Sequence, residues 1–338
     1  MLVRCFQNTN TDKYKNTNNN LKNDCFGVIN SRFIHEKCVN ILNEYFLKTY
    51  INNEYISLKS QIENILIEKQ VQTKVKSLAV VLHGWGANSI LYRDIASHVA
   101  EENIVLVPDF IGFGGSGEFT QVFNIYDYAL HIVKLLSLFE FDKLTLLAHS
   151  FGSRVMFALF EMVFNKSEFF QSYLMKYNLS IDELKKIIDK LKVVVIFGGA
   201  GVKPRFNLFK KIKILRYKAL KKKCKNNKKL TKKLLKYGSN DYKNAKNDNM
   251  RKTFLNVVNA NTFDKLSKVH LKILCEYFKI KFILIHGKRD KSTPLYMAKK
   301  MHKKLYNSQL YVLKKSGHFT FLDQFDDFMK IIECVSFS

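Results

Sequence analysis

The stretch that decides the fold is Leu146-Leu-Ala-His-Ser150-Phe-Gly152. The apolar run before it, Leu144–Leu147, is typical of a strand buried on both faces, and a helix is expected after it. A turn that passes this abruptly from strand to helix needs small residues two positions before and two after the serine, which Ala148 and Gly152 supply. Such a turn holds its serine in a strained backbone conformation that projects the hydroxyl clear of the sheet. The pattern therefore predicts a nucleophile elbow with Ser150 as the nucleophile.

Similar apolar runs recur on both sides of this turn, with helix-like segments between them. Alternation of buried strands with amphipathic helices predicts an α/β fold, with a mostly parallel central sheet flanked by helices. The other expected strands are Leu78–Leu82, Ile104–Val107, Val193–Phe197, Phe282–Ile285 and Gln309–Leu313. The expected helices are Ile90–Ala100, Ile125–Phe139 and Gly152–Phe164, the last extended by an insertion at Asn165–Lys190. Upstream, Tyr55–Lys59 and Ile62–Glu68 read as two strands of an antiparallel edge.

The general base and its supporting acid are expected at two later strand ends. Gly287-Lys-Arg-Asp290 follows the strand Phe282–Ile285, and Gly317-His318 follows the last strand. We expect His318 to take the proton of Ser150 and Asp290 to orient His318 and stabilise its imidazolium form. The chain order Ser, Asp, His is the order found in hydrolases that carry a nucleophile elbow. The acid could also follow the preceding strand, Val193–Phe197, but the loop there, Gly198-Gly-Ala-Gly201, contains no carboxylate. Asp290 is therefore the expected acid.

Two glycine-rich loops follow the first two buried strands. The first is Leu82-His83-Gly84-Trp85-Gly86, whose glycines allow the backbone to approach a substrate closely. The second runs from Asp109 to Ser116 and contains Gly112 and Gly114. It lacks the Lys-Ser/Thr pair of a phosphate-binding loop. It resembles instead the Asp-x-x-Gly-x-Gly-x-Ser loop that follows the fourth strand of a known hydrolase fold, and the resemblance implies a structural role for Asp109.

These motifs, each at a strand end and in this order, resemble the α/β-hydrolase fold, in its branch of bacterial-type esterases and C–C hydrolases. The resemblance runs from about Tyr55 to Asp327. It implies an oxyanion hole formed by the backbone amides of Trp85 and Phe151. His83, Gly84, Gly86, His149 and Gly152 are then expected to shape the site, and His286 and His302 to be ordinary structural or surface residues.

The resemblance also implies a helical cap, because the family places one between its sixth and seventh strands. Lys203–Asp264 lies at that position and shows no buried strand. Its first half, Lys203–Lys236, is dense in lysine and contains no acid, which predicts helices with a basic outer face. The expected organisation is a low-complexity extension at 1–39, a hydrolase core at 40–200 and 265–338, and a basic helical cap at 201–264.

Charge dominates the composition of the chain. The formal net charge is +27, from 56 Lys+Arg against 29 Asp+Glu, and there are only 3 prolines among 338 residues. Because the excess is mostly lysine in an asparagine-rich, proline-poor chain, we attribute it to codon drift and expect no specific nucleic-acid partner. Weak attraction of anionic membranes or anionic substrates by the basic cap remains an alternative. Oligomeric state is not predicted.

The remaining features bear on cofactors and location. The six cysteines form no close pair and no cluster with histidine at zinc spacing, so no metal or other cofactor is expected. The sequence shows no secretory signal and no membrane-spanning run, which predicts a cytoplasmic protein. The N-terminal extension is poor in acids, which leaves organellar targeting open.

Together these observations predict a serine hydrolase that acts on carboxylic esters or related acyl substrates through a Ser-His-Asp triad and an acyl-enzyme. C–C bond hydrolysis, thioester hydrolysis and acyl transfer use the same triad and stay open. An alternative from another class is a non-catalytic protein that binds anionic ligands on a hydrolase scaffold. The complete triad favours the enzyme, because a pure binding protein has no need of all three groups.

Overall fold

The structure is a computed structural model. It describes residues 74–99, 104–114, 116, 118–137, 139–205 and 239–335, together with the short pieces 3–6, 28–29 and 32–33 and helical positions at 212, 215, 216 and 219. The expected strands Tyr55–Lys59 and Ile62–Glu68, and most of the basic run at 203–236, lie outside these residues. In the described part, no helix is long and apolar enough to cross a membrane.

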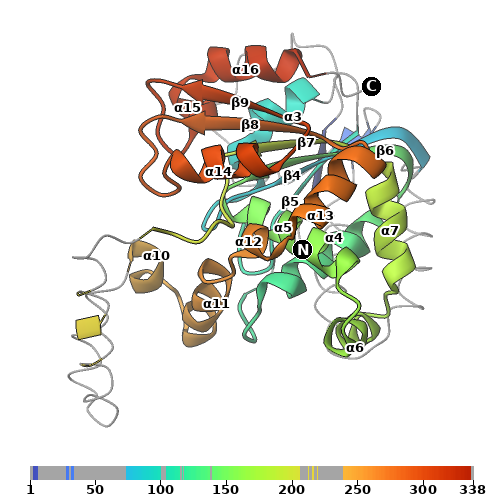
Figure 1. Cartoon of the computed structure of the whole chain (residues 1–338), viewed down its shortest axis with the longest axis horizontal. Helices are drawn as coiled ribbons and strands as arrows, with labels where there is room; N and C mark the ends of the chain where they lie inside the picture. The colour runs from blue at the N-terminus through green and yellow to red at the C-terminus, as the bar shows by residue number, and fades with distance from the viewer. Residues whose placement is uncertain are drawn as a thin grey trace.

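A seven-stranded sheet forms the centre of the molecule (Figure 1). Six neighbouring strands are parallel, and β1 pairs antiparallel with β5 at one edge. In spatial order the strands are β1 (Val3–Phe6), β5 (Ile104–Pro108), β4 (Lys74–Leu82), β6 (Glu140–His149), β7 (Leu191–Phe197), β8 (Lys281–Gly287) and β9 (Ser308–Leu313). The predicted α/β class and parallel sheet are confirmed.

Each of the six strands predicted for the parallel sheet is present, and most are longer than expected. In β6 the run Glu140–Lys143 alternates between exposed and buried positions, and continuous burial begins only at Leu144. Continuous apolar runs therefore identify only the part of a strand that is buried on both faces. They do not identify the partly exposed start of the strand. At the edge of the sheet beside β5, Val3–Phe6 forms a strand, although residues 1–39 were expected to be a low-complexity extension. The apolar residues Val3, Cys5 and Phe6 suit a strand of this length.

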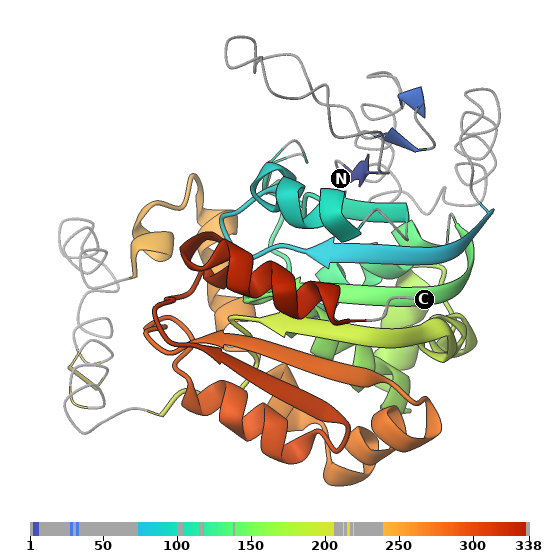
Figure 2. The ribbon, with the colours of Figure 1, turned by 90° about the horizontal axis from the view of Figure 1, so that it is seen from above.

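Helices cover both faces of the sheet. Alternate residues of β4 belong to two separate cores: Leu78 and Val80 pack on one face, and Ala79 and Val81 on the other. The first face carries α4 (Ile125–Leu136), α5 (Phe151–Phe164) and α7 (Ile181–Lys190), and the second carries α3 (Arg93–Val99) and α16 (Phe325–Glu333). Figure 2 shows α3 and α16 lying across one face of the strands.

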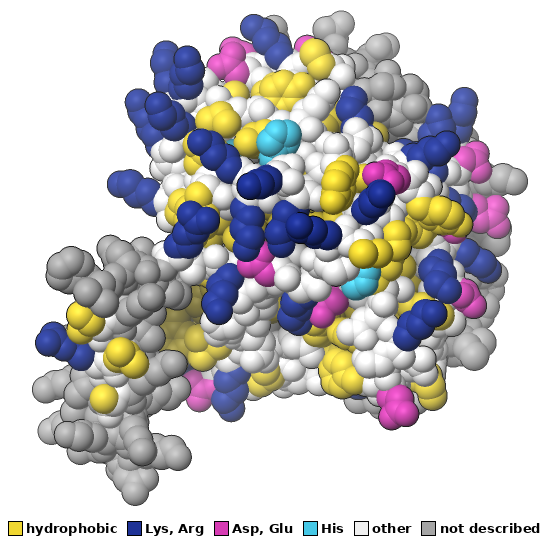
Figure 3. Space-filling model, in the orientation of Figure 1, with side chains coloured by type: hydrophobic (Ala, Val, Ile, Leu, Met, Phe, Trp, Pro, Cys, Tyr) yellow, Lys and Arg dark blue, Asp and Glu magenta, His cyan; other side chains and the backbone are white. Residues whose placement is uncertain are grey.

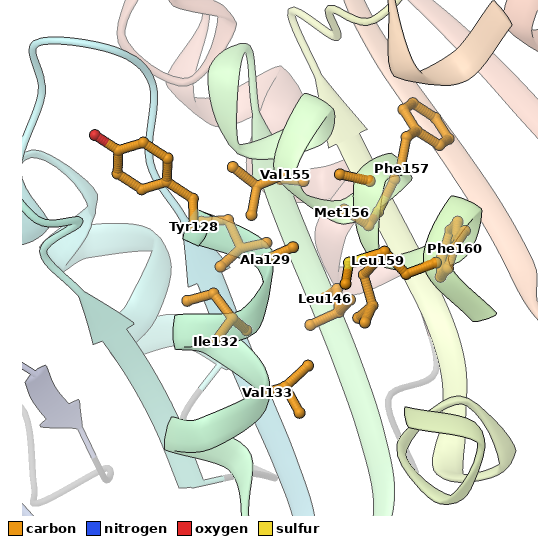
Figure 4. Packing of buried hydrophobic residues seen from close by; sticks show 14 of the residues in the cluster. Tyr128, Ala129, Ile132, Val133, Leu146, Val155, Met156, Phe157, Leu159 and Phe160 are labelled. Atoms are coloured by element: carbon orange, nitrogen blue, oxygen red, sulfur yellow. The ribbon is translucent and has the colours of Figure 1, made fainter. Parts of the chain in front are cut away.

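The packing of α4 and α5 against β6 fixes the direction in which the elbow points. Ile132 and Val133 of α4 and Val155 and Leu159 of α5 lie around Leu146 of β6 (Figure 4), and each of these side chains is at most 2% exposed. Burial of aliphatic side chains of this size contributes roughly 1.5–3 kcal/mol each. The start of α5, directly after Ser150, is thereby held close to the sheet.

The insertion at Asn165–Lys190 differs from the prediction that it extends the helix after Ser150. Helix α5 ends at Phe164, and Asn165 is extended, with φ −98° and ψ 108°. Two further helices follow, α6 (Glu168–Lys176) and α7. The polar run 165–167 separates α5 from α6, and Ser180 begins α7 with a reciprocal capping box to Glu183, which fixes the start of a separate helix.

A second insertion separates β7 from β8. No strand occurs in its described residues, which form α10 (Asn240–Lys243), α11 (Asp248–Val258), α12 (Thr262–Lys265), α13 (Lys268–Lys272) and a π-helical turn (Ile273–Tyr277). Helices α10 and α11 lie on the side toward which the parallel strands point (Figure 2). The insertion thus stands beside the strand ends, where ligands bind in open α/β sheets.

Candidate active site

Ser150 occupies the turn between β6 and α5. Its φ of 48° and ψ of −107° put it in a region that side-chain-bearing residues rarely adopt, and its backbone amide donates a hydrogen bond to the carbonyl of Phe197, 3.2 Å away. A Cβ atom on Gly152 would lie 2.2 Å from the backbone oxygen of Leu82. The need for a small residue two positions after the serine is therefore a direct consequence of how closely α5 approaches β4.

His318 lies in the loop after β9, beside Ser150. Its Nε2 is 2.9 Å from Ser150 Oγ, and its Nδ1 is 2.8 Å from Oδ2 of Asp290. An ionised carboxylate only accepts hydrogen bonds, so Nδ1 carries the proton and Nε2 is the acceptor for the serine hydroxyl. The His318 side chain is 16% exposed and that of Asp290 is fully buried. Three residues from three strand ends thus form one continuous hydrogen-bonded series.

Asp290 is held by a dense set of donors. Its Oδ1 accepts the backbone amides of Ser292 and Thr293, both at 2.8 Å, and its Oδ2 accepts from His318. Burial alone raises the pKa of Asp290, but the hydrogen bond and positive charge of His318 and the bonds from Thr293 outweigh it, so the net pKa is lowered. Asp290 is therefore ionised at neutral pH, as a group that stabilises an imidazolium must be.

Thr293, which the sequence did not single out, and His286 of β8 support the acid loop. Thr293 Oγ1 lies 2.8 Å from Asp290 Oδ2 and 2.9 Å from the carbonyl oxygen of Gly198. Its single hydroxyl proton can be donated to one of these two acceptors at a time. His286, expected to be an ordinary residue, is buried with Nε2 2.6 Å from the carbonyl of Thr293. His302, by contrast, is exposed and contacts Ser308, in keeping with its expected surface role. The sequence feature that could have pointed to Thr293 is its position three residues after Asp290 and directly before Pro294.

The two amides expected as oxyanion donors differ from that of Gly84 in their hydrogen bonding. Gly84 donates its N–H to the hydroxyl of Tyr92, 3.0 Å away, whereas no acceptor takes the N–H of Trp85 within the described part of the chain. Phe151 is the first residue of α5, where backbone amides have no partner inside the helix. Within the described part of the chain, the two expected oxyanion donors thus have no intramolecular acceptor.

An aromatic cluster surrounds Trp85. Its ring contacts those of Phe113, Phe119, Phe151 and Phe254, with centroid separations from 4.8 to 6.1 Å. Phe254 comes from α11, so this cluster is the point where the insertion meets the loop that carries the candidate oxyanion donor. Gly86, with φ 77°, makes the turn that follows Trp85.

His83 and His149 are both fully buried beside this loop. The Nδ1–H of His83 donates to the carbonyl of Gly84 at 2.7 Å, and its Nε2 accepts the amide of Phe110 at 2.9 Å. Burial lowers the pKa of both histidines, that of His149 to about 3, so both imidazoles are neutral. A Cβ atom on Gly84 would come within 2.8 Å of His149 Nδ1, which accounts for the glycine.

Asp109 fixes the neighbouring loop. Its carboxylate accepts the amide of Ser89 at 2.5 Å, and its backbone oxygen accepts the hydroxyl of Ser116 at 2.6 Å. These bonds join Asp109 to neighbouring loop residues and not to Ser150 or His318, in keeping with the structural role expected for Asp109. Among the described residues, no group of three or more His, Cys, Asp or Glu side chains is arranged to hold a metal ion.

Comparison with known proteins points to one fold. Residues 80–173 match the family described as alpha/beta hydrolase fold. The structure resembles an esterase from Exiguobacterium antarcticum, with a TM-score of 0.50 and 19% identity over 76% of this chain and 91% of that one. It also resembles a 2-hydroxy-6-oxo-6-phenylhexa-2,4-dienoate hydrolase from Rhodococcus, with a TM-score of 0.48 and 18% identity over 76% and 89% of the two chains.

Among curated sequences, a soluble epoxide hydrolase from Corynebacterium is 31% identical over 78 residues, which is 23% of this chain and 27% of that protein. The curated relatives that this chain matches are covered over only 22% to 27% of their length.

Proposed function

We propose that this chain, whose fold is the α/β-hydrolase fold, is a serine hydrolase that cleaves carboxylic esters or related acyl substrates through an acyl-enzyme. One observation carries the proposal: the unbroken series Ser150 Oγ, His318, Asp290, with bonds of 2.9 and 2.8 Å and Ser150 in the strained elbow conformation. Nucleophile, base and orienting acid in hydrogen-bond contact are what nucleophilic catalysis by serine requires.

In the acylation step, Ser150 Oγ attacks the carbonyl carbon of the substrate while its proton passes to His318 Nε2. The carbonyl oxygen becomes an anion that accepts the amides of Trp85 and Phe151, an effect worth roughly 3 kcal/mol per donor. The C–O bond then breaks, and the leaving alcohol takes the proton from His318. In the second half, a water molecule attacks the acyl carbon and gives one proton to His318 Nε2. The bond from the acyl carbon to Ser150 Oγ then breaks, His318 returns the proton to Ser150 Oγ, and the carboxylic acid leaves.

The residue at the elbow separates this proposal from some related chemistry. In this fold, epoxide hydrolases and dehalogenases use aspartate at the elbow, whereas this chain has Ser150. The resemblance to an epoxide hydrolase over 78 residues is therefore not extended to its reaction. C–C bond hydrolysis, thioester hydrolysis and acyl transfer use the same three groups and stay as alternatives within the proposal.

The basic charge supports a secondary proposal, that the insertion attracts anionic acyl substrates. Lys and Arg side chains are spread over much of the face seen in Figure 3, across the core as well as near the insertion, with fewer acids between them. Attraction of this kind is screened by salt. The rate of hydrolysis of an anionic acyl substrate should fall as ionic strength rises. A hydrolysis rate that does not change with salt would contradict this secondary proposal.

The proposed activity is tested with p-nitrophenyl esters from acetate to decanoate. We expect hydrolysis by the wild type and none above background by Ser150→Ala, with Ser172→Ala on the exposed face of α6 as the matched control that keeps full activity. The chain-length profile reports the size of the acyl site. Activity that survives in Ser150→Ala contradicts the proposal, and inactivity of the wild type on the whole series favours the non-catalytic alternative.

A further inference from the structure

We propose that Tyr92 and His149 form a buried relay of hydrogen bonds that positions the oxyanion loop and the base loop around Ser150. The relay rests on the proposed function, and its members are positioning residues, since neither contacts the reacting atoms. Tyr92 ends the 3-10 helix Ser89–Tyr92 that follows the β4 loop, and His149 is the residue directly before Ser150.

Three hydrogen bonds make the relay. The hydroxyl of Tyr92 lies 3.0 Å from the amide nitrogen of Gly84 and 2.8 Å from Nδ1 of His149. On the other side of the ring, Nε2 of His149 lies 3.1 Å from the carbonyl oxygen of His318. The relay therefore joins loops that follow β4, β6 and β9, which are the loops that carry the candidate oxyanion donor, nucleophile and base.

The donors and acceptors fit only one arrangement of protons for a neutral His149. The Gly84 amide can only donate, so the Tyr92 oxygen accepts there and gives its own proton to His149 Nδ1. The His149 proton is then on Nε2, where it faces the His318 carbonyl, which can only accept. The other tautomer would set the lone pair of Nε2 against the lone pairs of that carbonyl and leave the Tyr92 proton without an acceptor at Nδ1.

Burial keeps these protons in place. Tyr92 and His149 are 0% and 1% exposed, and the His149 ring stacks on Phe197 with 5.2 Å between centroids and 26° between planes. Burial raises the pKa of Tyr92, and burial together with the charge of His318 lowers the pKa of His149. The nearness of His318, whose ring centroid is 4.8 Å from that of His149, thus adds to burial in keeping His149 neutral. The proton from Ser150 therefore goes to His318 and not to its neighbour.

The relay acts on catalysis through Gly84. Tyr92 binds the Gly84 amide, which lies in the peptide plane before Gly84, and His83 binds the Gly84 carbonyl, which lies in the plane that carries the Trp85 amide, so the planes on both sides of the Gly84 Cα are held. Removal of the Tyr92 hydroxyl leaves the Gly84 amide without its buried acceptor, which frees the first plane and, through the Gly84 Cα, loosens the second. Since a missing oxyanion donor lowers kcat by about 10²–10³-fold, a misplaced one should lower it by about 10- to 100-fold.

The test compares Tyr92→Phe with Tyr128→Phe. Both residues are fully buried tyrosines whose hydroxyls bond the backbone, Tyr92 to the amide of Gly84 and Tyr128, at 3.2 Å, to the carbonyl of Ile111, which is not a member of the relay. On the p-nitrophenyl ester that the wild type cleaves best, Tyr92→Phe should lower kcat by about 10- to 100-fold with KM within about twofold. Tyr128→Phe should keep kcat within about twofold at a similar loss of stability. Equal kcat in the two variants overturns the relay and leaves Tyr92 a packing residue.

A second readout does not depend on activity. The imidazole ¹⁵N signals of His149, assigned by their loss in His149→Gln, should show the proton on Nε2 in the wild type and a changed proton distribution in Tyr92→Phe. A proton on Nδ1 in the wild type overturns the relay. If the wild type lacks Ser150-dependent hydrolysis but shows the expected tautomer, the proposed function fails and the hydrogen-bonded arrangement stands.

Discussion

The strand-end loops of the core and the insertion between β7 and β8 differ in how they are supported near the candidate site. In the loops, buried directional hydrogen bonds connect one strand end to the next, such as the bond of 2.8 Å between His318 and Asp290. The described insertion is joined to the core by hydrogen bonds, such as that of 2.9 Å from the amide of Phe123 to Thr253 Oγ1, but it meets the Trp85 side chain through an aromatic ring, that of Phe254, at 5.3 Å.

This difference matters because directional bonds fix atoms to within tenths of an ångström, whereas apolar packing tolerates changes of shape. Reacting groups need the first kind of support, and a wall that accommodates an acyl chain can rest on the second. Changes in the loops should therefore act on kcat and on stability, and changes in the insertion should act on KM and on substrate size.

The largest effect is expected for the base. His318→Asn removes the proton acceptor of Ser150 while the backbone carbonyl that His149 contacts is kept. We expect kcat for the preferred ester to fall by about 10⁴-fold with a small change in KM, measured in steady-state assays. The corresponding change in the insertion, described below, should leave kcat nearly untouched. A loss of less than tenfold in His318→Asn would remove His318 from the mechanism.

The next effect is on stability. Gly152→Ala places a Cβ atom 2.2 Å from the backbone oxygen of Leu82, which cannot move aside as a side chain would. We expect the free energy of unfolding in urea to fall by about 3 kcal/mol. Gly317→Ala is the matched control, since its nearest neighbour is a side-chain oxygen of Asp323 at 3.4 Å, an ordinary contact. Equal losses in the two variants would show that the close approach of α5 to β4 is not as described.

Acid should destabilise the loops through their buried histidines. The folded-state pKa of His149, about 3, lies below its unfolded value near 6.5, so the unfolded chain binds more protons between these limits. Stability is therefore complete above pH 6.5 and falls as the pH drops, by about 1.4 kcal/mol per unit from His149 alone. Urea unfolding at pH 7 and pH 5 should differ by about 2 kcal/mol or more.

A matched variant assigns this pH dependence. His149→Phe keeps a ring against Phe197 and removes the titrating group, so its unfolding free energy should vary less with pH between 7 and 5. Identical slopes in the wild type and His149→Phe would contradict the assignment of a buried neutral imidazole at this position.

The smallest effect is expected in the insertion. Phe254→Ala removes the ring that α11 packs against Trp85, and we expect KM for long-chain esters to rise about tenfold while kcat on acetate stays within about twofold. Leu255→Ala, one residue along and 39% exposed, is the control and should change neither constant. A fall in kcat that is equal for short and long esters would place Phe254 among the groups that support the chemistry.

Residues that stand in local sequence patterns could be predicted, and residues that act through contacts in space could not. The elbow, the acid and the base could be predicted because each is a local pattern tied to the end of an apolar strand. Tyr92 and Thr293 were missed because their roles arise from residues brought together in space: Tyr92 and His149 are 57 positions apart. The division of 165–190 into two separate helices was missed because its signals, Asn165 after α5 and the capping at Ser180, are weaker local patterns than the apolar strands.

Covalent labelling of the nucleophile tests most directly whether Ser150, His318 and Asp290 act together. A fluorophosphonate reacts with an activated serine, and mass spectrometry of the digested protein identifies the modified residue. We predict a single adduct on the peptide that contains Ser150, absent in Ser150→Ala and formed far more slowly in His318→Asn. Labelling at another serine, or a rate at Ser150 that does not depend on His318, would contradict the claim that the three strand ends assemble an active hydrolase site.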